Sequence, residues 1–202
     1  MQRALTSMNK SIDFYFDFIS PYSYIAHKKI IRLNLRKNFN YKAILLGGLH
    51  NLGKITAPAF NERKMKNMKN DCILISNKNN IPFKWNEKFP LNSLYLMRGF
   101  LLIDKIKKDK FIDLCFDAYW KDNVDITLEE NIEKILYKCN IDKKSFHQGI
   151  KEQKIKDELK ELTDKAFALN IFGAPTFIIN EKLFWGQDRL EYALEELTPK
   201  LF

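Results

Sequence analysis

SIDFYFDFISPYSY, residues 11–24, is the stretch of sequence that decides the fold. Its first part, residues 11–18, alternates apolar and polar residues and is rich in aromatic side chains, which predicts a β-strand. Ser20 is a favoured helix N-cap, and Pro21 is a favoured first residue of a helix. A strand that leads directly into a helix N-terminus indicates an α/β fold.

The residues that follow extend this beginning into a complete unit. Residues 22–37 carry spaced apolar positions with basic residues between them, which predicts a helix. Residues 41–46 (YKAILL) predict a second strand, and the Gly47-Gly48 pair is expected to stop it. A strand, a helix and a second strand in this order form a βαβ unit, whose two strands are expected to be parallel.

The middle of the chain is predicted to be helical. Apolar residues recur at spacings of three and four, as they do on the buried face of an amphipathic helix. These stripes most simply form a helical core. They run over residues 94–101, 111–119, 128–139 and 154–169.

The C-terminal part returns to sheet. Residues 175–180 and 182–185 predict two strands of a hairpin, with Asn180-Glu181 as the turn. Asp188 and Glu191 have capping-box spacing, so Asp188 is expected to open a last helix. The order βαβ, a long helical segment and then ββα is that of thioredoxin-like folds with a large α-helical insertion, although periodicity alone does not separate it from other α/β folds.

Composition places the chain among ordinary soluble globular proteins. Its 202 residues are 46% hydrophobic and 29% charged. No apolar run approaches the roughly 20 residues of a membrane span, so no membrane association is expected. Residues 1–10 lack the apolar stretch of a secretory signal, so we expect them to be a disordered N-terminal extension and not a signal, with Met8 as an alternative start.

Charge and cysteine content narrow the function classes further. The net charge of +9 comes from lysines that are interleaved with acids along the chain, which is typical of solvated helix faces and does not predict nucleic-acid binding. It does suit a small anionic ligand. The three cysteines are widely spaced and include no CxxC pair, so neither a disulfide framework nor a metal site is expected. Cys115 and Cys139 are expected to be buried free thiols, and the cytoplasm is the expected compartment.

Four segments together carry a family resemblance. Residues 14–24 closely resemble the first strand and active-site turn of the 2-hydroxychromene-2-carboxylate isomerase and kappa-class glutathione transferase family. The other segments occur in the family's order and spacing over nearly the whole chain. They are Leu45-Leu46-Gly47-Gly48, Phe89-Pro90-Leu91-Asn92-Ser93 with Arg98 beyond it, and residues 172–177 followed by 184–190.

The resemblance implies a domain organisation and a partner. Residues 11–55 and 171–202 would form a thioredoxin-like domain related to those of periplasmic disulfide oxidoreductases. Residues 56–170 would form a helical insertion domain. Members of the family bind glutathione and often form homodimers, so both are expected here.

Ser20 is the expected catalytic residue. Where disulfide oxidoreductases of this fold have CxxC, this chain has Ser20-Pro21-Tyr22-Ser23, so it carries no redox dithiol there. A helix N-terminus lowers the pKa of a nearby thiol. The resemblance implies that the thiol belongs to glutathione and that the Ser20 hydroxyl donates a hydrogen bond to its sulfur. Alternatively, Ser20 is only an N-cap.

The resemblance also implies which residues hold the rest of glutathione. The backbone of Ala174 would pair with the cysteinyl backbone beside a cis Pro175, as an added strand does. Gln187 and Asp188 would hold the γ-glutamyl end at a helix N-terminus. Alternatively, Pro175 only begins a strand and Asp188 only caps a helix. The expected contacts are Ser20, Lys64, Ala174, Pro175, Trp185, Gly186, Gln187 and Asp188.

The segment expected to bind a second substrate matches the family pattern less closely than the glutathione segments do. Kappa-class members tend to have Gly-Asn where this chain has Gly53-Lys54. Lys64 is expected to reach the glycyl carboxylate, and Arg98 is as readily a structural ion-pair partner. The residues expected to contact the second substrate are His50, Phe89 and Asn92. Alternatively, His50 is only a surface loop residue.

The leading interpretation is a glutathione-dependent cis–trans isomerase acting on an unsaturated aromatic-derived oxo acid. Reversible thiolate addition turns a double bond into a single bond that can rotate, and elimination then restores glutathione. Two alternatives stay open: a kappa-type transferase or peroxidase, and a non-catalytic protein that binds glutathione or a partner chain.

Overall fold

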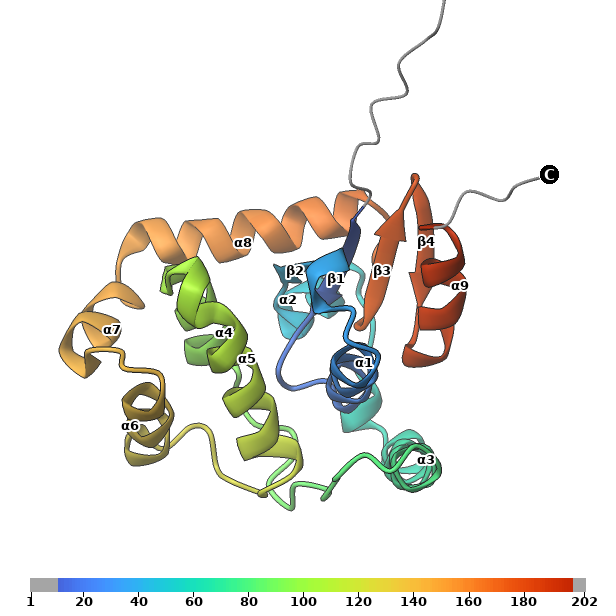
Figure 1. Cartoon of the computed structure of the whole chain (residues 1–202), viewed down its shortest axis with the longest axis horizontal. Helices are drawn as coiled ribbons and strands as arrows, with labels where there is room; N and C mark the ends of the chain where they lie inside the picture. Colours follow the sequence, from blue (N-terminus) through green and yellow to red (C-terminus); the bar gives the residue numbers. More distant parts are fainter. Residues whose placement is uncertain (1–10, 198–202) are drawn as a thin grey trace, which may run out of the picture.

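The computed structural model describes residues 11–197, and in that part of the chain the strands form one mixed sheet with the order β2-β1-β3-β4 (Figure 1). β1 and β2 are parallel, with Phe14 opposite Tyr41, whereas β3 is antiparallel to both β1 and β4. The predicted α/β class and thioredoxin-like order are confirmed. The strands are β1 (Ile12–Phe16), β2 (Phe39–Ala43), β3 (Thr176–Ile179) and β4 (Lys182–Trp185). The extension expected at residues 1–10, with the alternative start at Met8, lies outside the described residues.

Helices surround this sheet. They are α1 (Pro21–Arg32), α2 (Leu46–Leu52), α3 (Glu62–Lys78), α4 (Leu94–Leu102), α5 (Lys105–Trp120), α6 (Glu129–Lys138), α7 (Lys143–Gly149), α8 (Gln153–Ala168) and α9 (Leu190–Glu195). Within residues 11–197 three 3₁₀ turns supplement them: η1 (Arg36–Asn38), η2 (Pro58–Phe60) and η3 (Gln187–Arg189). Between residues 11 and 197 no helix combines the length and the apolar character that a bilayer crossing requires.

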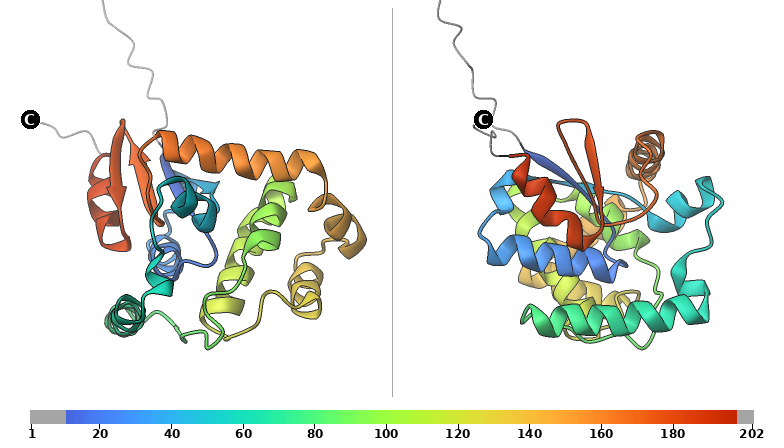
Figure 2. Two further views of the ribbon diagram at one scale, coloured as in Figure 1. Left: turned by 180° about the vertical axis from the view of Figure 1, so that it is seen from behind. Right: turned by 90° about the vertical axis from the view of Figure 1, so that its right-hand side faces the viewer.

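The arrangement is layered. α8 runs along the side of the sheet near β2 and α2, and α9 packs on β3 and β4 (Figures 1 and 2). α4, α5, α6 and α7 gather beyond the β2 edge, and α3 lies on the far side of α1 from the sheet. Most of the insertion helices therefore lie beyond the β2 edge of the sheet, whereas α9 packs on β3 and β4.

An aromatic cluster joins the sheet to the insertion. The Phe14 ring stacks on Phe177 at 5.2 Å, which connects β1 to β3. The Phe16 ring meets Phe100 of α4 edge-on at 5.2 Å, and the ring of Phe18 meets Phe116 of α5 at 4.9 Å. Residues 11–18 thus form a strand and the start of the following turn, and their aromatic side chains hold two layers together. Burial of these side chains is a large part of the driving force for folding.

Two local expectations about the second strand are wrong. β2 begins and ends earlier than residues 41–46, and Gly47-Gly48 do not stop it but lie inside α2. Contacts with distant parts of the chain explain why a helix begins at this point. The amide of Leu46 donates to the carboxylate of Asp17, and the amide of Leu45 donates to the hydroxyl of Thr163. Helix N-termini need such acceptors, and here two distant segments supply them.

Some of the other helices were predicted from the sequence and some were not. The four stripes of the middle segment correspond to α4, α5, α6 and α8. α3 and α7 were not predicted, because α3 buries only Met68, Cys72 and Ser76 along a narrow seam, and α7 has seven residues. The expected capping box at Asp188 is wrong: α9 begins at Leu190 after η3, and no side chain caps either element.

We retain the division into a thioredoxin-like domain (11–55 and 171–202) and an insertion (56–170) as a proposal. Its basis is that α3 to α8 all fall between β2 and β3 in the sequence. Residues 198–202 of that division lie outside the described part of the chain.

Candidate functional site

The turn between β1 and α1 places Ser20 at the N-terminus of α1. Ser20 has extended backbone angles (φ −83°, ψ 114°), and its hydroxyl oxygen accepts a hydrogen bond from the Ser23 amide at 3.1 Å. Pro21 is the first helical residue, as its fixed φ favours. The hydroxyl of Ser20 donates a hydrogen bond to the carbonyl oxygen of Ala174 at 2.8 Å. Ser20 is therefore the N-cap that the sequence predicts, and it also connects α1 to the segment before β3.

Asp17 holds this turn in place through its buried carboxyl, and it was not among the site residues predicted from the sequence. The carboxyl is fully buried and accepts hydrogen bonds from the Ser93 hydroxyl (2.6 Å) and from the amides of Leu46 (2.9 Å) and Ile19 (3.1 Å). Burial raises the pKa of Asp17, and these hydrogen bonds oppose that rise. A lone carboxylate within the otherwise apolar run Phe14–Ile19 is the signal that could have identified it.

The helical insertion holds the backbone of the same turn. The indole N–H of Trp120 on α5 donates to the carbonyl of Phe18 at 2.9 Å. The Phe18 amide donates to the sulfur of Met97 on α4 at 3.5 Å. Buried backbone groups need such partners. The position of the Ser20 turn is therefore fixed by insertion helices as well as by the sheet.

Ala174 and Pro175 face the Ser20 turn from the other side. The Ala174–Pro175 peptide bond is cis. The carbonyl of Pro175 accepts from the Gly186 amide at 2.9 Å, which joins this segment to the end of β4. Gly186 has φ 112°, a conformation that favours glycine. Four of the expected contact residues, Ser20 among them, are thereby brought to one end of the sheet.

Trp185 borders that group with an exposed ring. Its side chain is 52% exposed and packs against Phe172, with ring centroids 4.7 Å apart. Gly173 allows this position, because a Cβ there would lie 2.6 Å from the indole nitrogen of Trp185. An exposed aromatic ring beside a polar turn offers a flat apolar contact for a ligand.

The side chains of Gln187 and Asp188 have partners of their own. Gln187 is 7% exposed, and its carbonyl oxygen accepts from the ammonium of Lys29 at 2.6 Å. Lys29 belongs to the last turn of α1, at the opposite end from Ser20. Asp188 is exposed and accepts from the guanidinium of Arg189 at 2.7 Å. Their role toward glutathione stays a prediction, and Gln187 is directed along α1 away from the Ser20 turn.

Lys64 is not joined to this group. It lies exposed in the first turn of α3, where its backbone amide is capped by Asn61 at 3.0 Å. Across residues 11–197 its side chain forms no hydrogen bond or ion pair with the Ser20 turn. Lys54 follows α2 with φ 52°. An asparagine adopts this left-handed conformation more readily than lysine does, so the departure from Gly-Asn has a conformational cost.

The expected second-substrate residues are dispersed. His50 is half-buried on α2, and burial lowers its pKa. The ring of Phe89 packs against Trp85 at 5.0 Å and against Trp120 at 5.6 Å, so it belongs to the aromatic cluster behind the turn. Asn92 is exposed, and its side-chain oxygen accepts from the Leu94 amide at 2.9 Å. The structure does not bring these three side chains into contact with one another.

All three cysteines are buried free thiols, as predicted for two of them. Burial raises the pKa of Cys72 and of Cys115, and it also raises that of Cys139. A thiol with a raised pKa stays protonated near neutral pH and is a poor nucleophile. None of the three cysteines is therefore suited to act as a nucleophile near neutral pH.

Comparison with known proteins gives a consistent result. A profile described as the DSBA-like thioredoxin domain matches residues 11–198. A 2-hydroxychromene-2-carboxylate isomerase of Pseudomonas putida is 26% identical over 94% of this chain and 95% of its own. The human glutathione S-transferase kappa 1 is 25% identical over 95% of this chain and 92% of its own.

Solved structures agree. A 2-hydroxychromene-2-carboxylate isomerase superimposes with a TM-score of 0.82 at 25% identity, covering 92% of this chain and 95% of that chain. A probable DsbA oxidoreductase of Streptomyces coelicolor has a TM-score of 0.70 at 12% identity, with 96% and 93% covered, which shows the shared fold alone. The predicted resemblance is confirmed. The chain belongs to the DSBA-like thioredoxin domain family, and within it resembles the 2-hydroxychromene-2-carboxylate isomerases and the kappa-class glutathione transferase.

Proposed function

We propose that this protein is a glutathione-dependent cis–trans isomerase for an unsaturated aromatic-derived oxo acid. The observation that carries the proposal is the Ser20 hydroxyl, which caps α1 and donates across to the Ala174 carbonyl beside a cis proline. Glutathione would supply a thiol nucleophile that adds to a double bond and leaves again. The similarity to proteins named as isomerases supports the reaction type.

The donors and acceptors at the turn fit a thiol tripeptide. When Ser20 turns its O–H from Ala174 toward a sulfur, the Ala174 carbonyl is released and can accept from the cysteinyl amide. This exchange keeps both protein groups hydrogen-bonded, which buried polar groups require. The N-terminus of α1 adds a partial positive charge that favours the thiolate. Ser20 thus stabilises the thiolate and is not itself the nucleophile.

The rest of the ligand has weaker support. The γ-glutamyl ammonium would compete with Arg189 for Asp188, and the exposure of that pair makes the exchange inexpensive. Trp185 and Gly186 border the same end of the sheet. Lys64, His50, Phe89 and Asn92 complete the proposal for the glycyl carboxylate and the second substrate. We further propose a cytoplasmic homodimer, in keeping with the unpaired thiols.

The decisive experiment measures the pKa of glutathione bound to the protein from its thiolate absorbance. In the wild type this pKa is expected to lie below that of free glutathione. Ser20→Ala removes a hydrogen bond to a charged group and is expected to raise the pKa by about one to two units.

Ser23→Ala is the matched control. The Ser23 hydroxyl is buried three residues away and has no hydrogen-bond partner between residues 11 and 197. Its removal is expected to leave the thiol pKa unchanged. Equal pKa values in the wild type and the Ser20 variant would reject Ser20 as thiolate stabiliser, and lack of glutathione binding would reject the proposal as a whole.

A kappa-type transferase or peroxidase is the second candidate, because the human kappa-class relative is similar over nearly the same length. Product analysis separates the two. An isomerase returns free glutathione in full after turnover of an unsaturated oxo acid, whereas a transferase leaves a stable conjugate. Glutathione binding without a lowered thiol pKa would instead indicate a binding protein without catalysis.

A further inference from the structure

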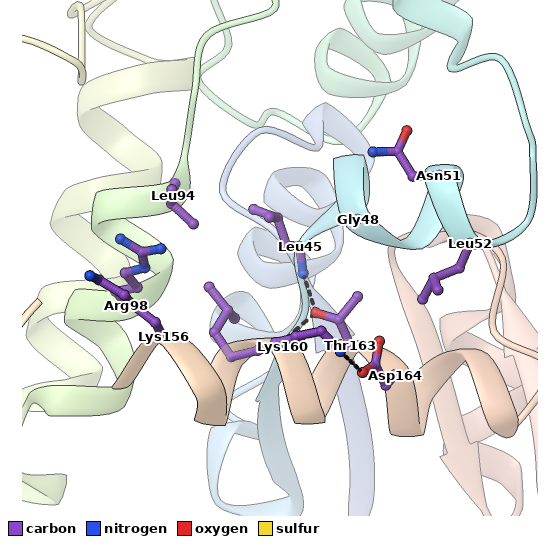
Figure 3. Close-up of a pocket in the computed structure, with 11 residues that line it drawn as sticks. Leu45, Gly48, Asn51, Leu52, Leu94, Arg98, Lys156, Lys160, Thr163 and Asp164 are labelled. Atoms are coloured by element: carbon purple, nitrogen blue, oxygen red, sulfur yellow. Dashed lines mark hydrogen bonds and ion pairs between the residues drawn. The ribbon is translucent and has the colours of Figure 1, made fainter. Parts of the chain in front are cut away.

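A cavity of about 400 Å³ lies between α2, α4 and α8, apart from the Ser20 turn (Figure 3). Its apolar wall is formed by Leu45, Leu52, Leu94 and Leu159. Small-molecule sites in proteins have volumes of roughly 300–1,000 Å³ and are mostly apolar with a few polar groups. The cavity has the size and the apolar lining of such a site.

Its charged groups are mainly positive. Arg98 projects from α4, and Lys156 and Lys160 project from α8. Asp164 is the acid of the lining, and it pairs with Lys160 at 2.6 Å. In the described part of the chain neither Arg98 nor Lys156 forms an ion pair. The cavity thus presents two cations without a carboxylate of their own.

Arg98 shows a second, independent sign of a missing partner. Its Nε is buried and has no hydrogen-bond acceptor among residues 11–197. Buried donors are normally paired, because leaving one unsatisfied is costly. Arginine also presents donors in a planar fork that matches a carboxylate. The sequence allows Arg98 to be one partner of a structural ion pair, but the described residues provide no carboxylate that pairs with it.

The cavity is distinct from the site at Ser20. None of the residues expected to hold glutathione or its second substrate lines it. Asp17 connects the two regions. Its carboxyl accepts from the Ser93 hydroxyl and the Leu46 amide, and these residues are the sequence neighbours of the lining residues Leu94 and Leu45. A ligand in the cavity would therefore contact the far side of the structure that fixes the active-site turn.

We infer that this cavity binds a small organic acid, with its carboxylate on Arg98 and Lys156 and its apolar body against the four leucines. The unpaired Nε and the two cations select an anion, and the leucines select an apolar body over a phosphate or a sugar acid. The site goes beyond the proposed function, since it needs neither glutathione nor Ser20.

The test is calorimetric titration of the full-length protein with 3-phenylpropanoate, a saturated acid to which a thiol does not add. The acid is expected to bind at one site, and 3-phenylpropanamide, its neutral counterpart, is expected to bind at least about tenfold more weakly. Arg98→Gln and Lys156→Gln are each expected to weaken binding of the acid by about tenfold or more.

Lys154→Gln is the matched control, because Lys154 is an exposed lysine of the same helix that does not line the cavity. It is expected to bind the acid as the wild type does, and melting curves verify that all variants fold. Unchanged affinity in Ser20→Ala, and in the presence of saturating glutathione, supports a separate site. Equal binding of acid and amide, wild-type affinity in both cavity variants, or competitive displacement by glutathione would each overturn the inference.

Discussion

Two helical N-termini face the end of the sheet, and they differ in how they are held. Both Ser20 and Asp188 have the sequence signature of a helix cap. At Ser20 the local cap forms, and two groups outside the helix support it: the Ala174 carbonyl accepts from the Ser20 hydroxyl, and the backbone carbonyl of Asp17 accepts from the Ser20 amide at 3.0 Å. At Asp188 no side-chain cap forms, and Gln187 instead pairs with Lys29 on α1. A local cap signal is realised where distant contacts agree with it, and the first terminus is the one that is held by a side-chain cap.

The largest expected effect on stability comes from removing the Asp17 carboxyl, which supports the turn that leads into α1. Asp17→Ala leaves the buried hydroxyl of Ser93 and the partly buried amides of Leu46 and Ile19 without an acceptor. We therefore expect the free energy of unfolding to fall by about 3 kcal/mol or more in urea denaturation. Asp17→Asn is expected to lie between this variant and the wild type, because it keeps one acceptor oxygen.

Asp13→Ala is the control for the loss of an aspartate nearby, because Asp13 lies in β1 and Asp17 directly follows that strand. Asp13 is partly exposed and lies 3.8 Å from Lys42, an arrangement worth about 1 kcal/mol or less. If Asp17→Ala costs no more than Asp13→Ala, then the buried carboxyl does not organise the turn.

The second expected effect concerns His27, in the body of α1 between its two ends. The ring is fully buried and bonds Tyr41 and Asp113, both at 2.9 Å. Burial lowers the pKa of His27 and outweighs the opposing effect of Asp113. The unfolded chain therefore takes up the proton first, and the free energy of unfolding is expected to fall as pH drops below about 6.5, by at most about 1.4 kcal/mol per pH unit.

Urea denaturation between pH 5 and pH 7 tests this dependence. His27→Gln is expected to flatten the slope, whereas His147→Gln on α7 is the control for losing a histidine elsewhere. A slope that is the same in all three proteins would show that His27 is not the group responsible.

The third expected effect on stability comes from removing the Ser20 cap. Ser20→Ala removes the acceptor for the Ser23 amide and is expected to lower the free energy of unfolding by about 1 kcal/mol. Ser23→Ala is expected to cost less, because that hydroxyl has no partner in the described residues. Thermal unfolding of both variants measures the difference, and equal melting temperatures would count against the cap.

The smallest effects belong to the second terminus. Gln187→Ala breaks the partly buried bond to Lys29 and is expected to cost about 1 kcal/mol or less. Asp188→Ala removes an exposed pair with Arg189 and is expected to stay within about 0.5 kcal/mol. Under the proposed function Asp188→Ala nevertheless weakens glutathione binding. A large loss of stability in Asp188→Ala would reverse the comparison of the two termini.

The sequence by itself determined what depends on neighbouring residues and on composition. Short windows of the sequence are enough to predict several features. These are the β1 strand, the Ser20 cap with Pro21 at the first helical position, the four helical stripes and the lack of a CxxC pair. The Ser20–Ser23 bond spans three residues, so its chemistry can be read directly from the order of side chains.

Only the tertiary structure decided the rest. Asp17 and Ser93 are 76 residues apart, and no local pattern predicts that the Asp17 carboxyl will accept from Ser93 and also from the first turn of α2. The direction of Gln187 toward Lys29 and the cavity around Arg98 arise in the same way. The reason is that a buried polar group takes the partner that folding brings to it, and that partner is set by the packing of whole helices and not by the residues beside it.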